Sequence, residues 1–385
     1  MKVLHVVERI DESYGGPAKS IPALCKSLKA YGVNSKIISV NLQDDKNESI
    51  NRANIPWIKC NPLFNNKLYI SLSFIHKLWQ EIRTADIVHL HSIWTPPSII
   101  TYTYSKLLKK SLVISPRSSL LSMSLLKSKR IKLVARYFFV DKLLNKASAI
   151  IATSALEKDQ LPVYLHKKTA IIPNAINPDD FTSLLSKTDA KNKLHVSRDE
   201  IAIGFISRIH KRKGFDRFID LCINAATNNN HKRLKFLAAG PIDDKKLFDT
   251  QIEKLKKHNI IENFTYLGFV DGNEKTEFYC ACDLIVLPSS FENFGMSIAE
   301  SLYFGTPVIC STGTPWTEIN SINAGWCVEL ENFDKTLTFA LNSDLSLLGC
   351  NARNYIIDNF SEERVGAAMS NTYYSISKGK PDDTN

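Results

Sequence analysis

Short apolar runs of the kind that form buried strands alternate with helix-length segments along most of the chain. Strands separated by helix-length connections pair in parallel, so this alternation predicts parallel sheets covered by helices, an α/β fold. In the N-terminal half, we expect strands at residues 2–7, 35–40, 87–90, 112–115, 149–153 and 169–172, and helices near residues 17–31, 70–83 and 97–109. In the C-terminal half, we expect strands at residues 201–206, 235–239, 264–267, 284–287 and 308–310.

The chain is long enough for two domains. Its 385 residues exceed one ordinary core, and its 44% hydrophobic and 23% charged residues are typical of a soluble globular protein. The two series of strands, joined around residues 171–181, predict two Rossmann-like domains that face a central cleft. We expect the first domain over residues 1–175, the second over 176–360, a helix over 361–377 and a disordered tail over 378–385.

The segment of residues 283–305 carries the strongest functional signal. An apolar strand leads into a Pro/Ser turn and then into a helix, which we expect to open near Gly295 and Met296 and to end with Gly305 as its left-handed cap. Parallel α/β proteins bind ligands at the carboxyl ends of their strands, where this turn lies. The N–H groups at Phe294–Ser297, together with the positive end of the helix dipole, can hold an anion such as a diphosphate.

Two carboxylates, Glu292 and Glu300, flank this expected anion site. Carboxylates accept hydrogen bonds from hydroxyl groups, so a ligand that carries both phosphate and sugar explains the two features together. The pattern Glu-x-Phe-Gly-x4-Glu, which stands here as Glu292, Phe294, Gly295 and Glu300, resembles the donor-site signature of retaining glycosyltransferases of the GT4 family, which have the GT-B fold.

Three further segments resemble this family, in the same order along the chain. Ser13-Tyr-Gly-Gly-Pro17 follows the first strand, Ile171-Ile-Pro-Asn-Ala175 is similar to the hinge segment, and the run from Gly204 to Gly214 follows a later strand. The expected helix at residues 361–377 resembles the family's final helix, which crosses back to the first domain. The resemblance covers most of the chain and implies a glycosyltransferase of the kind that builds bacterial cell-surface polysaccharides.

By this resemblance, Arg208 and Lys213 hold the donor diphosphate. Cations suit that role because the leaving nucleoside diphosphate gains negative charge as the sugar bond breaks. Arg offers a planar fork to phosphate oxygens, and Lys offers a point charge. Gly15 and Gly16 would let the backbone approach a phosphate without interference from a Cβ atom. Without the resemblance, the first pair reads as a solvated basic turn and the second as a flexible turn.

The resemblance also assigns roles to the second motif. It implies that Glu300 binds the ribose hydroxyls of the donor and that Glu292 orients the sugar with the backbone of Phe294, Gly295 and Met296. Retention without an obvious enzyme nucleophile implies front-face attack, in which the leaving phosphate oxygen takes the acceptor proton. A double displacement through Glu292 is the alternative.

The acceptor is expected to bind to the first domain. His91 lies at the end of a strand, where its side chain is expected to face the cleft, whereas His89 is expected to be buried. His91 matches a family position near the reacting sugar and acceptor, and Arg117 follows the next strand. We therefore expect His91 and Arg117 to bind the acceptor, and we count as catalytic His91, Arg208, Lys213 and Glu292.

Positive charge is concentrated in the N-terminal half. Residues 1–187 contain 27 Lys and Arg against 13 Asp and Glu, a net charge of +14, whereas the remainder has a net charge of −4. A basic face suits a polyanion, either nucleic acid or an anionic membrane. Residues 125–140 predict a basic amphipathic helix for a membrane surface, although a packed helix with solvated cations is equally consistent. Its basic side chains are Lys127, Lys129, Arg130, Lys132 and Arg136.

Two further patterns in the sequence limit which cofactors and which cellular compartment we expect. No Asp-x-Asp stands at an expected strand end, so we expect no metal site and no cofactor besides the nucleotide sugar, a UDP- or GDP-linked donor. The eight cysteines are scattered through apolar surroundings and read as packing thiols in a reducing cytoplasm.

These patterns predict a cytoplasmic enzyme on the inner face of the cell membrane. It would be a retaining glycosyltransferase that moves a hexose-type sugar to a lipid-linked or polysaccharide acceptor of lipopolysaccharide, O-antigen or capsule. The alternatives are a GT-B sugar-nucleotide 2-epimerase, which needs no acceptor, and a soluble glucan synthase, which needs no membrane face. Nucleic acid is not an expected partner, because RNA-recognition motifs with exposed aromatic stacking sets are absent.

Overall fold

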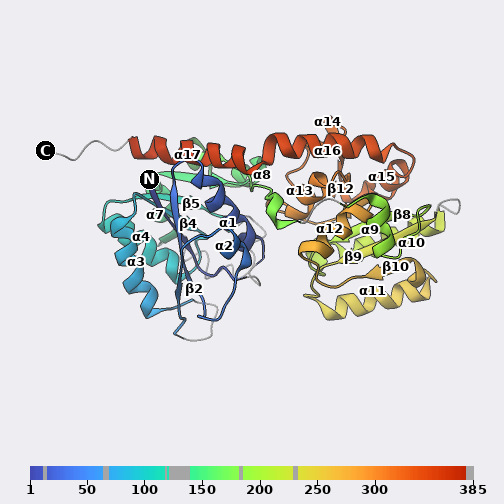
Figure 1. Ribbon diagram of the computed structural model, residues 1–385, viewed down its shortest axis with the longest axis horizontal. Coiled ribbons are helices and arrows are strands. Elements are labelled where there is room, and N and C mark those ends of the chain that lie inside the picture. The colour runs from blue at the N-terminus through green and yellow to red at the C-terminus, as the bar shows by residue number, and fades with distance from the viewer. Residues whose placement is uncertain are drawn as a thin grey trace. The chain divides into compact units, whose positions relative to one another are not determined.

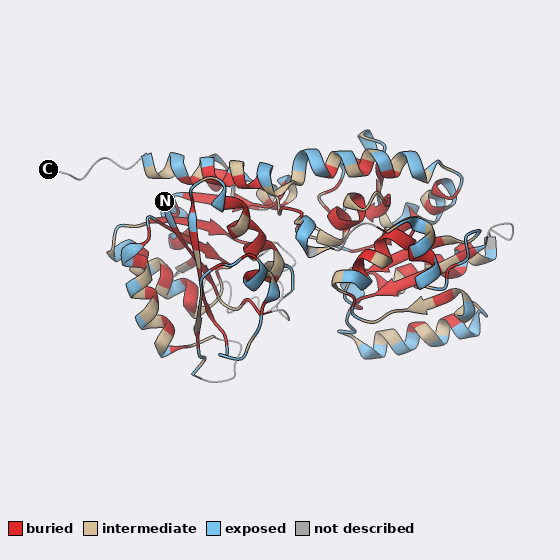
Figure 2. Cartoon of the chain, viewed as in Figure 1, coloured by how far each residue is buried: buried red, intermediate tan, exposed pale blue. Residues whose placement is uncertain are grey.

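The computed structural model describes residues 1–11, 15–63, 69–117, 119–120, 139–181, 185–228 and 233–378 (Figure 1). They form two compact units, one made of Met1–Ala175 with Phe360–Asn385 and the other of Ile176–Asn359. Each unit contains one parallel sheet with helices on its faces, which confirms the predicted α/β class. In both units the strands are mostly buried and the helices expose their outer sides (Figure 2).

The sheet of the first unit has seven strands in the order β3-β2-β1-β4-β5-β6-β7. The chain adds strands on one side of β1 and then crosses to the other side at β4. The strand order therefore reverses between β1 and β4, the place where such sheets bind ligands. The strands are β1 (Lys2–Val7), β2 (Asn34–Val40), β3 (Trp57–Cys60), β4 (Ile87–His91), β5 (Ser111–Ser115), β6 (Ala149–Ala152) and β7 (Thr169–Ile171).

Helices cover both faces of this sheet, and β4 shows how its residues divide between them. Val88 and Leu90 pack into the core under α3, α4 and α7. Ile87 packs into the opposite core, which α1 and α17 complete, because neighbouring residues of a strand face opposite ways. The helices of this unit are α1 (Gly16–Lys29), α2 (Glu48–Arg52), α3 (Leu72–Thr84), α4 (Pro96–Leu107), α7 (Asp141–Lys146), α8 (Ala155–Asp159), η3 (Val163–Lys168) and α17 (Glu362–Lys378).

The last helix, α17, is an integral part of the first unit. Val365, Met369 and Tyr373 lie in the same core as Leu24 and Leu28 of α1. The two helices approach closely, since a Cβ atom on Gly366 would lie 2.8 Å from the carbonyl oxygen of Ser27. Lys378, which the sequence placed in a disordered tail, is the final residue of this helix, and residues 379–385 lie outside the described part of the chain.

The sheet of the second unit has six strands in the order β10-β9-β8-β11-β12-β13. Its strand order reverses between β8 and β11. The strands are β8 (Ile201–Ile206), β9 (Leu234–Ala239), β10 (Phe264–Tyr266), β11 (Leu284–Leu287), β12 (Val308–Ser311) and β13 (Gly325–Val328). The helices are η4 (Pro178–Asp180), α9 (Lys187–Lys193), η5 (Lys211–Lys213), α10 (Phe215–Asn228), α11 (Lys245–Lys257), η6 (Ile261–Asn263), α12 (Gly272–Ala281), α13 (Met296–Tyr303), α14 (Glu318–Ser321), η7 (Leu330–Asn332), α15 (Phe333–Ala340) and α16 (Leu345–Phe360).

The predicted helix after β11 is confirmed at both ends. Helix α13 begins at Met296 with Gly295 as its N-cap. It ends before Gly305, whose φ of 74° is left-handed. The N–H groups of Gly305 and Thr306 donate to the carbonyls of Leu302 and Ser301, both at 3.0 Å, which is the Schellman pattern.

Two features concern the membrane. Among the described residues, no helix is both long enough and apolar enough to cross a bilayer. The predicted basic helix at residues 125–140 falls almost wholly on residues 121–138, which lie outside the described part of the chain.

Candidate active site

The loops that follow β8 and β11 are in backbone contact at the point where the strand order reverses. Gly214 ends the first loop with a left-handed φ of 79°, and a Cβ atom there would lie 2.1 Å from the carbonyl oxygen of Pro288 in the second loop. The N–H of Ser290 donates to the carbonyl of Arg212 at 2.9 Å. Only glycine fits at position 214, and the two loops are therefore fixed relative to each other.

A third loop, which follows β12, holds the second loop from its other side. The N–H of Glu292 donates to the carbonyl of Gly313 at 3.0 Å. A Cβ atom on Gly313 would lie 2.3 Å from the carbonyl oxygen of Ser290. The hydroxyl of Ser311 donates to the carbonyl of Ser289. The segment that carries Glu292 is thus held by backbone contacts with both neighbouring strand ends.

These loops bring Lys213 and Glu292 together. The Lys213 ammonium lies 2.6 Å from each oxygen of the Glu292 carboxylate, and the Ser289 hydroxyl donates to Oε1 of Glu292 at 2.9 Å. The two charged side chains are only 14% and 17% exposed, so their attraction is less screened than that of a surface pair. A cation suited to phosphate and a carboxylate suited to sugar hydroxyls thus share one place.

Arg208, the other predicted phosphate ligand, makes a different contact. It lies just after β8, and its guanidinium forms an ion pair with Asp243 at 2.7 Å. Both side chains are partly exposed to solvent. The structure therefore pairs Lys213 with Glu292 and Arg208 with Asp243.

The start of α13 supplies backbone donors beside this cluster. Gly295, the N-cap, has a left-handed φ of 81°, and the indole of Trp316 donates to the carbonyl of Phe294. The first N–H groups of a helix have no acceptor within it, so those of Met296 and Ser297 can serve an anion.

Glu300, about one turn further along α13, lies in a buried polar cluster that the sequence did not reveal. Its Oε1 accepts from the Lys275 ammonium at 2.5 Å, and its Oε2 accepts from the Tyr279 hydroxyl at 2.8 Å. All three residues are buried. Burial, together with the nearby charge of Glu300, raises the pKa of Tyr279 well above its ordinary value, so the phenol stays a donor.

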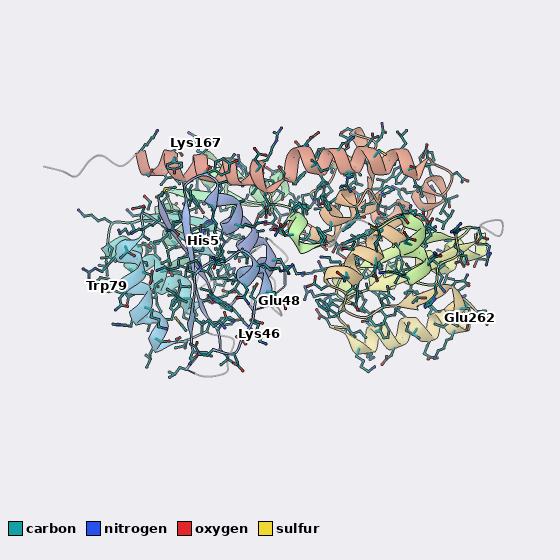
Figure 3. All side chains as sticks on the ribbon, viewed as in Figure 1. His5, Lys46, Glu48, Trp79, Lys167 and Glu262 are labelled. Carbon is teal, nitrogen blue, oxygen red and sulfur yellow. The ribbon has the colours of Figure 1, made fainter. Side chains whose placement is uncertain are left out.

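In the first unit, three histidines gather where β1 and β4 run side by side. His5 on β1 is labelled in Figure 3. Its ring stacks against that of His91 on β4, with centroids 5.4 Å apart, and is tilted by 41° against that of His89, with centroids 5.2 Å apart. His89 also contacts Tyr373 of α17 at 2.6 Å and Ser115 of β5 at 2.8 Å. His91 is 1% exposed, so the expectation that its side chain is open to a cleft is wrong, whereas the expected burial of His89 is confirmed.

Arg117 fixes the protonation pattern of this cluster. Its Nε–H donates to Nδ1 of His91 at 3.1 Å, so Nδ1 carries no proton and the neutral ring is protonated at Nε2. That Nε2–H then donates to Nδ1 of His5 at 3.0 Å. His5 in turn carries its proton on Nε2, a buried atom without a partner among the described residues. Arg117 also donates to Ser20 at 3.0 Å and has a left-handed φ of 48°.

The environment keeps all three imidazoles neutral. Burial and the charge of Arg117 lower the pKa of His5 to about 3. Burial is also the main cause that holds the pKa of His89 and His91 well below the ordinary value, with neighbouring histidines and Arg117 adding to it.

The three histidines are also close enough to share a metal ion, since one nitrogen of each lies within 4.8 Å of the others. Five of their six nitrogens are, however, already in hydrogen bonds. The guanidinium of Arg117 beside His91 would also repel a divalent cation. The geometry therefore favours a hydrogen-bond network over a metal centre.

Gly15 and Gly16 lie in the first unit, after β1. Gly15 is the N-cap of α1, with a left-handed φ of 88°, and Gly16 is the first residue of that helix. Among the residues that the structure describes, which exclude 12–14, a Cβ atom on either glycine would meet nothing within 4 Å. These residues leave room for a phosphate to approach the backbone.

Comparisons with known proteins agree with the fold. Residues 14–180 match the model of Glycosyltransferase Family 4, and residues 186–357 match that of Glycosyl transferases group 1. The lipopolysaccharide core biosynthesis mannosyltransferase LpsB of Rhizobium meliloti (strain 1021) is 23% identical over 61% of this chain and 67% of its own. A 41.2 kDa protein in the cps region of Klebsiella pneumoniae is 26% identical over 66% of this chain and 67% of its own.

Among solved structures, Anabaena Alr3699/HepE in complex with UDP and glucose has a TM-score of 0.79, with 16% identity over 97% of this chain and 100% of its own. This likeness concerns the fold, and it confirms the predicted GT-B architecture. The two family models together cover most of both units. The chain therefore combines a Glycosyltransferase Family 4 domain with a Glycosyl transferases group 1 domain, and it belongs to the glycosyltransferases that carry both.

Proposed function

We propose that the chain is a retaining glycosyltransferase that moves a hexose-type sugar from a UDP- or GDP-linked donor to a lipid-linked or polysaccharide acceptor of a cell-surface glycan. The contact between Lys213 and Glu292 carries this proposal, because it unites a phosphate ligand and a sugar ligand where the strand order of the second unit reverses. The similarity to a lipopolysaccharide mannosyltransferase supports the class of acceptor.

In the proposed reaction, an acceptor hydroxyl attacks the anomeric carbon on the face from which the diphosphate leaves. The bond from that carbon to the phosphate oxygen breaks, and the departing oxygen takes the acceptor proton. Lys213 and Arg208 stabilise the charge of the leaving diphosphate. Because both oxygens of Glu292 contact Lys213, this carboxylate is better suited to orient the sugar than to act as the nucleophile of a double displacement.

The proposed reaction needs no metal ion. Lys213, Arg208 and the N–H groups at the start of α13 offer the positive charge that a metal would otherwise bring to the diphosphate.

For the acceptor, we assign the direct contact to Arg117 and a supporting role to His91. Arg117 is partly exposed, whereas His91 is buried behind it and accepts its hydrogen bond. The enzyme is proposed to work on the cytoplasmic face of the membrane, to which its basic N-terminal half is attracted.

A panel of nucleotide sugars tests the proposal. Thermal shift with UDP- and GDP-linked hexoses should show one stabilising donor, because a ligand at a hundred times its Kd adds about 2.7 kcal/mol to stability. NMR of the transfer product should show the anomeric configuration of the donor, and a chelator should leave the rate unchanged. An inverted product would refute retention, and turnover of the donor without any acceptor would favour the epimerase.

A further inference from the structure

We propose that Lys275 and Tyr279 are positioning residues of the donor site, which fix the Glu300 carboxylate so that it selects ribonucleotides over 2′-deoxyribonucleotides. The inference rests on the proposed function, in which Glu300 binds the ribose of the donor. It assigns a role to two residues of α12 that lie outside the donor motif.

The contacts of Glu300 determine how many hydrogen-bond acceptor positions its carboxylate can offer to a ligand. Lys275 and Tyr279 are one helical turn apart and donate to different oxygens of the carboxylate, at 2.5 and 2.8 Å. Each carboxylate oxygen offers about two acceptor sites. One site therefore remains on each oxygen, and the two together match the 2′- and 3′-hydroxyls of a ribose.

The surrounding core holds both donors in place. The ring of Tyr279 is fully buried and stacks on Phe304, with centroids 5.2 Å apart and an angle of 12° between the planes. Its carbonyl accepts from the hydroxyl of Thr306 at 2.9 Å. The ammonium of Lys275 lies 5.7 Å from the ring of Phe181. The plane of the Glu300 carboxylate is therefore set before any nucleotide arrives.

The charge of Lys275 determines how well Glu300 accepts. A buried carboxyl without a cation beside it tends to take up a proton, which turns one of its oxygens into a donor. The ammonium of Lys275 is the cation that pairs with the Glu300 carboxylate, and Lys275→Met would remove it. The Tyr279 hydroxyl is uncharged, and its hydrogen bond orients the Glu300 carboxylate.

The test compares ribonucleotides with their 2′-deoxy forms by calorimetry. The probes are UDP, GDP, 2′-deoxy-UDP and 2′-deoxy-GDP. Wild type should bind the ribo form of its preferred nucleotide about tenfold or more tightly, as expected for a hydrogen bond to a charged group. Lys275→Met should reduce this ratio to about threefold or less. Tyr279→Phe should reduce it by a smaller factor, and Lys275→Arg should preserve it.

Lys191→Met is the matched control. Lys191 is also buried and also pairs with a carboxylate, that of Asp283 at 2.8 Å, but this pair lies at the amino end of β11. Its removal should leave the ratio at the wild-type value. The double variant Lys275→Met/Glu300→Gln removes both charges, so it keeps the cluster neutral if the single variant does not fold. It should lose the discrimination as well.

The outcomes separate the two proposals. A wild-type protein that binds neither UDP nor GDP would refute the proposed function. Wild type that binds ribo and deoxy forms equally, or Lys275→Met with an unchanged ratio, would overturn the role of Lys275 while leaving the glycosyltransferase proposal intact.

Discussion

Lys213 is placed to contact two groups at once. An ammonium has three N–H donors, and two of those of Lys213 point to the oxygens of Glu292. One donor remains for a phosphate oxygen. In the proposed reaction, Lys213 can therefore hold the leaving diphosphate while it keeps Glu292, the carboxylate proposed to orient the sugar, in a fixed position.

Lys213→Ala should lower kcat/KM by about 10²–10³-fold, because it removes a charge whose interaction strengthens as the diphosphate departs. Lys211→Ala is the matched control, since Lys211 lies in the same turn, η5, but is exposed. Steady-state kinetics with the donor found in the panel would check both. Similar rates for the two variants would contradict the assignment of Lys213.

Substitutions of Glu300 and Glu292 should change different kinetic constants. Glu300→Gln should mainly raise the KM for the donor, because a ribose contact forms equally in the ground state and the transition state. Glu292→Gln should mainly lower kcat, because the orientation of the sugar matters most when the bond breaks. Measuring kcat and KM for both variants tests this, and the reverse pattern would show that the two roles are exchanged.

At the scale of elements, the proposed donor site depends on loops that are in backbone contact. Gly214→Ala should lower the free energy of unfolding of the second unit by about 3 kcal/mol or more, since a left-handed alanine and a backbone clash add together. Gly268→Ala isolates the first effect, because Gly268 has a similar φ of 75° and open space around it, and should cost about 1 kcal/mol.

Urea denaturation followed by amide exchange in β8 and β11 would measure both glycine variants. Equal losses for the two would show that the contact with Pro288 does not hold the loops together.

The cluster of His5, His89 and His91 predicts that the stability of the first unit depends on pH. The pKa of His5 is about 3 in the folded state and near 6.5 when unfolded, so between these values the unfolded chain binds more protons. Stability is therefore complete above pH 6.5 and falls as the pH drops, by about 1.4 kcal/mol per pH unit for each such histidine.

Amide exchange at pH 7.5 and 5, corrected for intrinsic rates, would measure this effect. Protection in β1 and β4 should fall more than in β8 and β11, where no buried histidine lies. An equal change in both sheets would show that the three histidines are not held neutral.

The sequence predicted the central elements better than the edges and the polar partners. The strands β1, β8 and β11 have the predicted bounds, because most of their residues are apolar. The strands β3 and β13 were missed, since each is a short edge strand with a mixed pattern of burial. Lys275 and Tyr373 were missed because their partners lie 25 and 284 residues away, a separation that no local pattern reveals.

At the scale of the whole molecule, the charge asymmetry makes a prediction that rests on sequence alone. Replacing Lys127, Lys129, Arg130 and Lys132 by Gln removes four positive charges and should cost about 4 kcal/mol of attraction to an anionic leaflet. Flotation with anionic liposomes should fall sharply. The matched control replaces four exposed lysines of α11, namely Lys245, Lys246, Lys256 and Lys257, and should float as wild type does.

If the wild-type protein does not bind anionic liposomes at low salt, the membrane proposal is refuted. Activity on a short soluble acceptor should survive the first set of substitutions, because Arg208, Lys213, Glu292 and Glu300 belong to the other unit.

The position of α17 in the first unit has a consequence for folding during synthesis. A ribosome delivers β1 to β7 first, at about 5–20 residues per second, and then has to make residues 176–359 before α17 emerges. Until then, Leu24 and Leu28 of α1 lack the cover of Val365 and Met369, and His89 lacks the hydroxyl of Tyr373. All residues of the second unit are therefore synthesised before the first unit has its last helix. During that time, part of the apolar surface of the N-terminal sheet is exposed and accessible to chaperones, until α17 covers it.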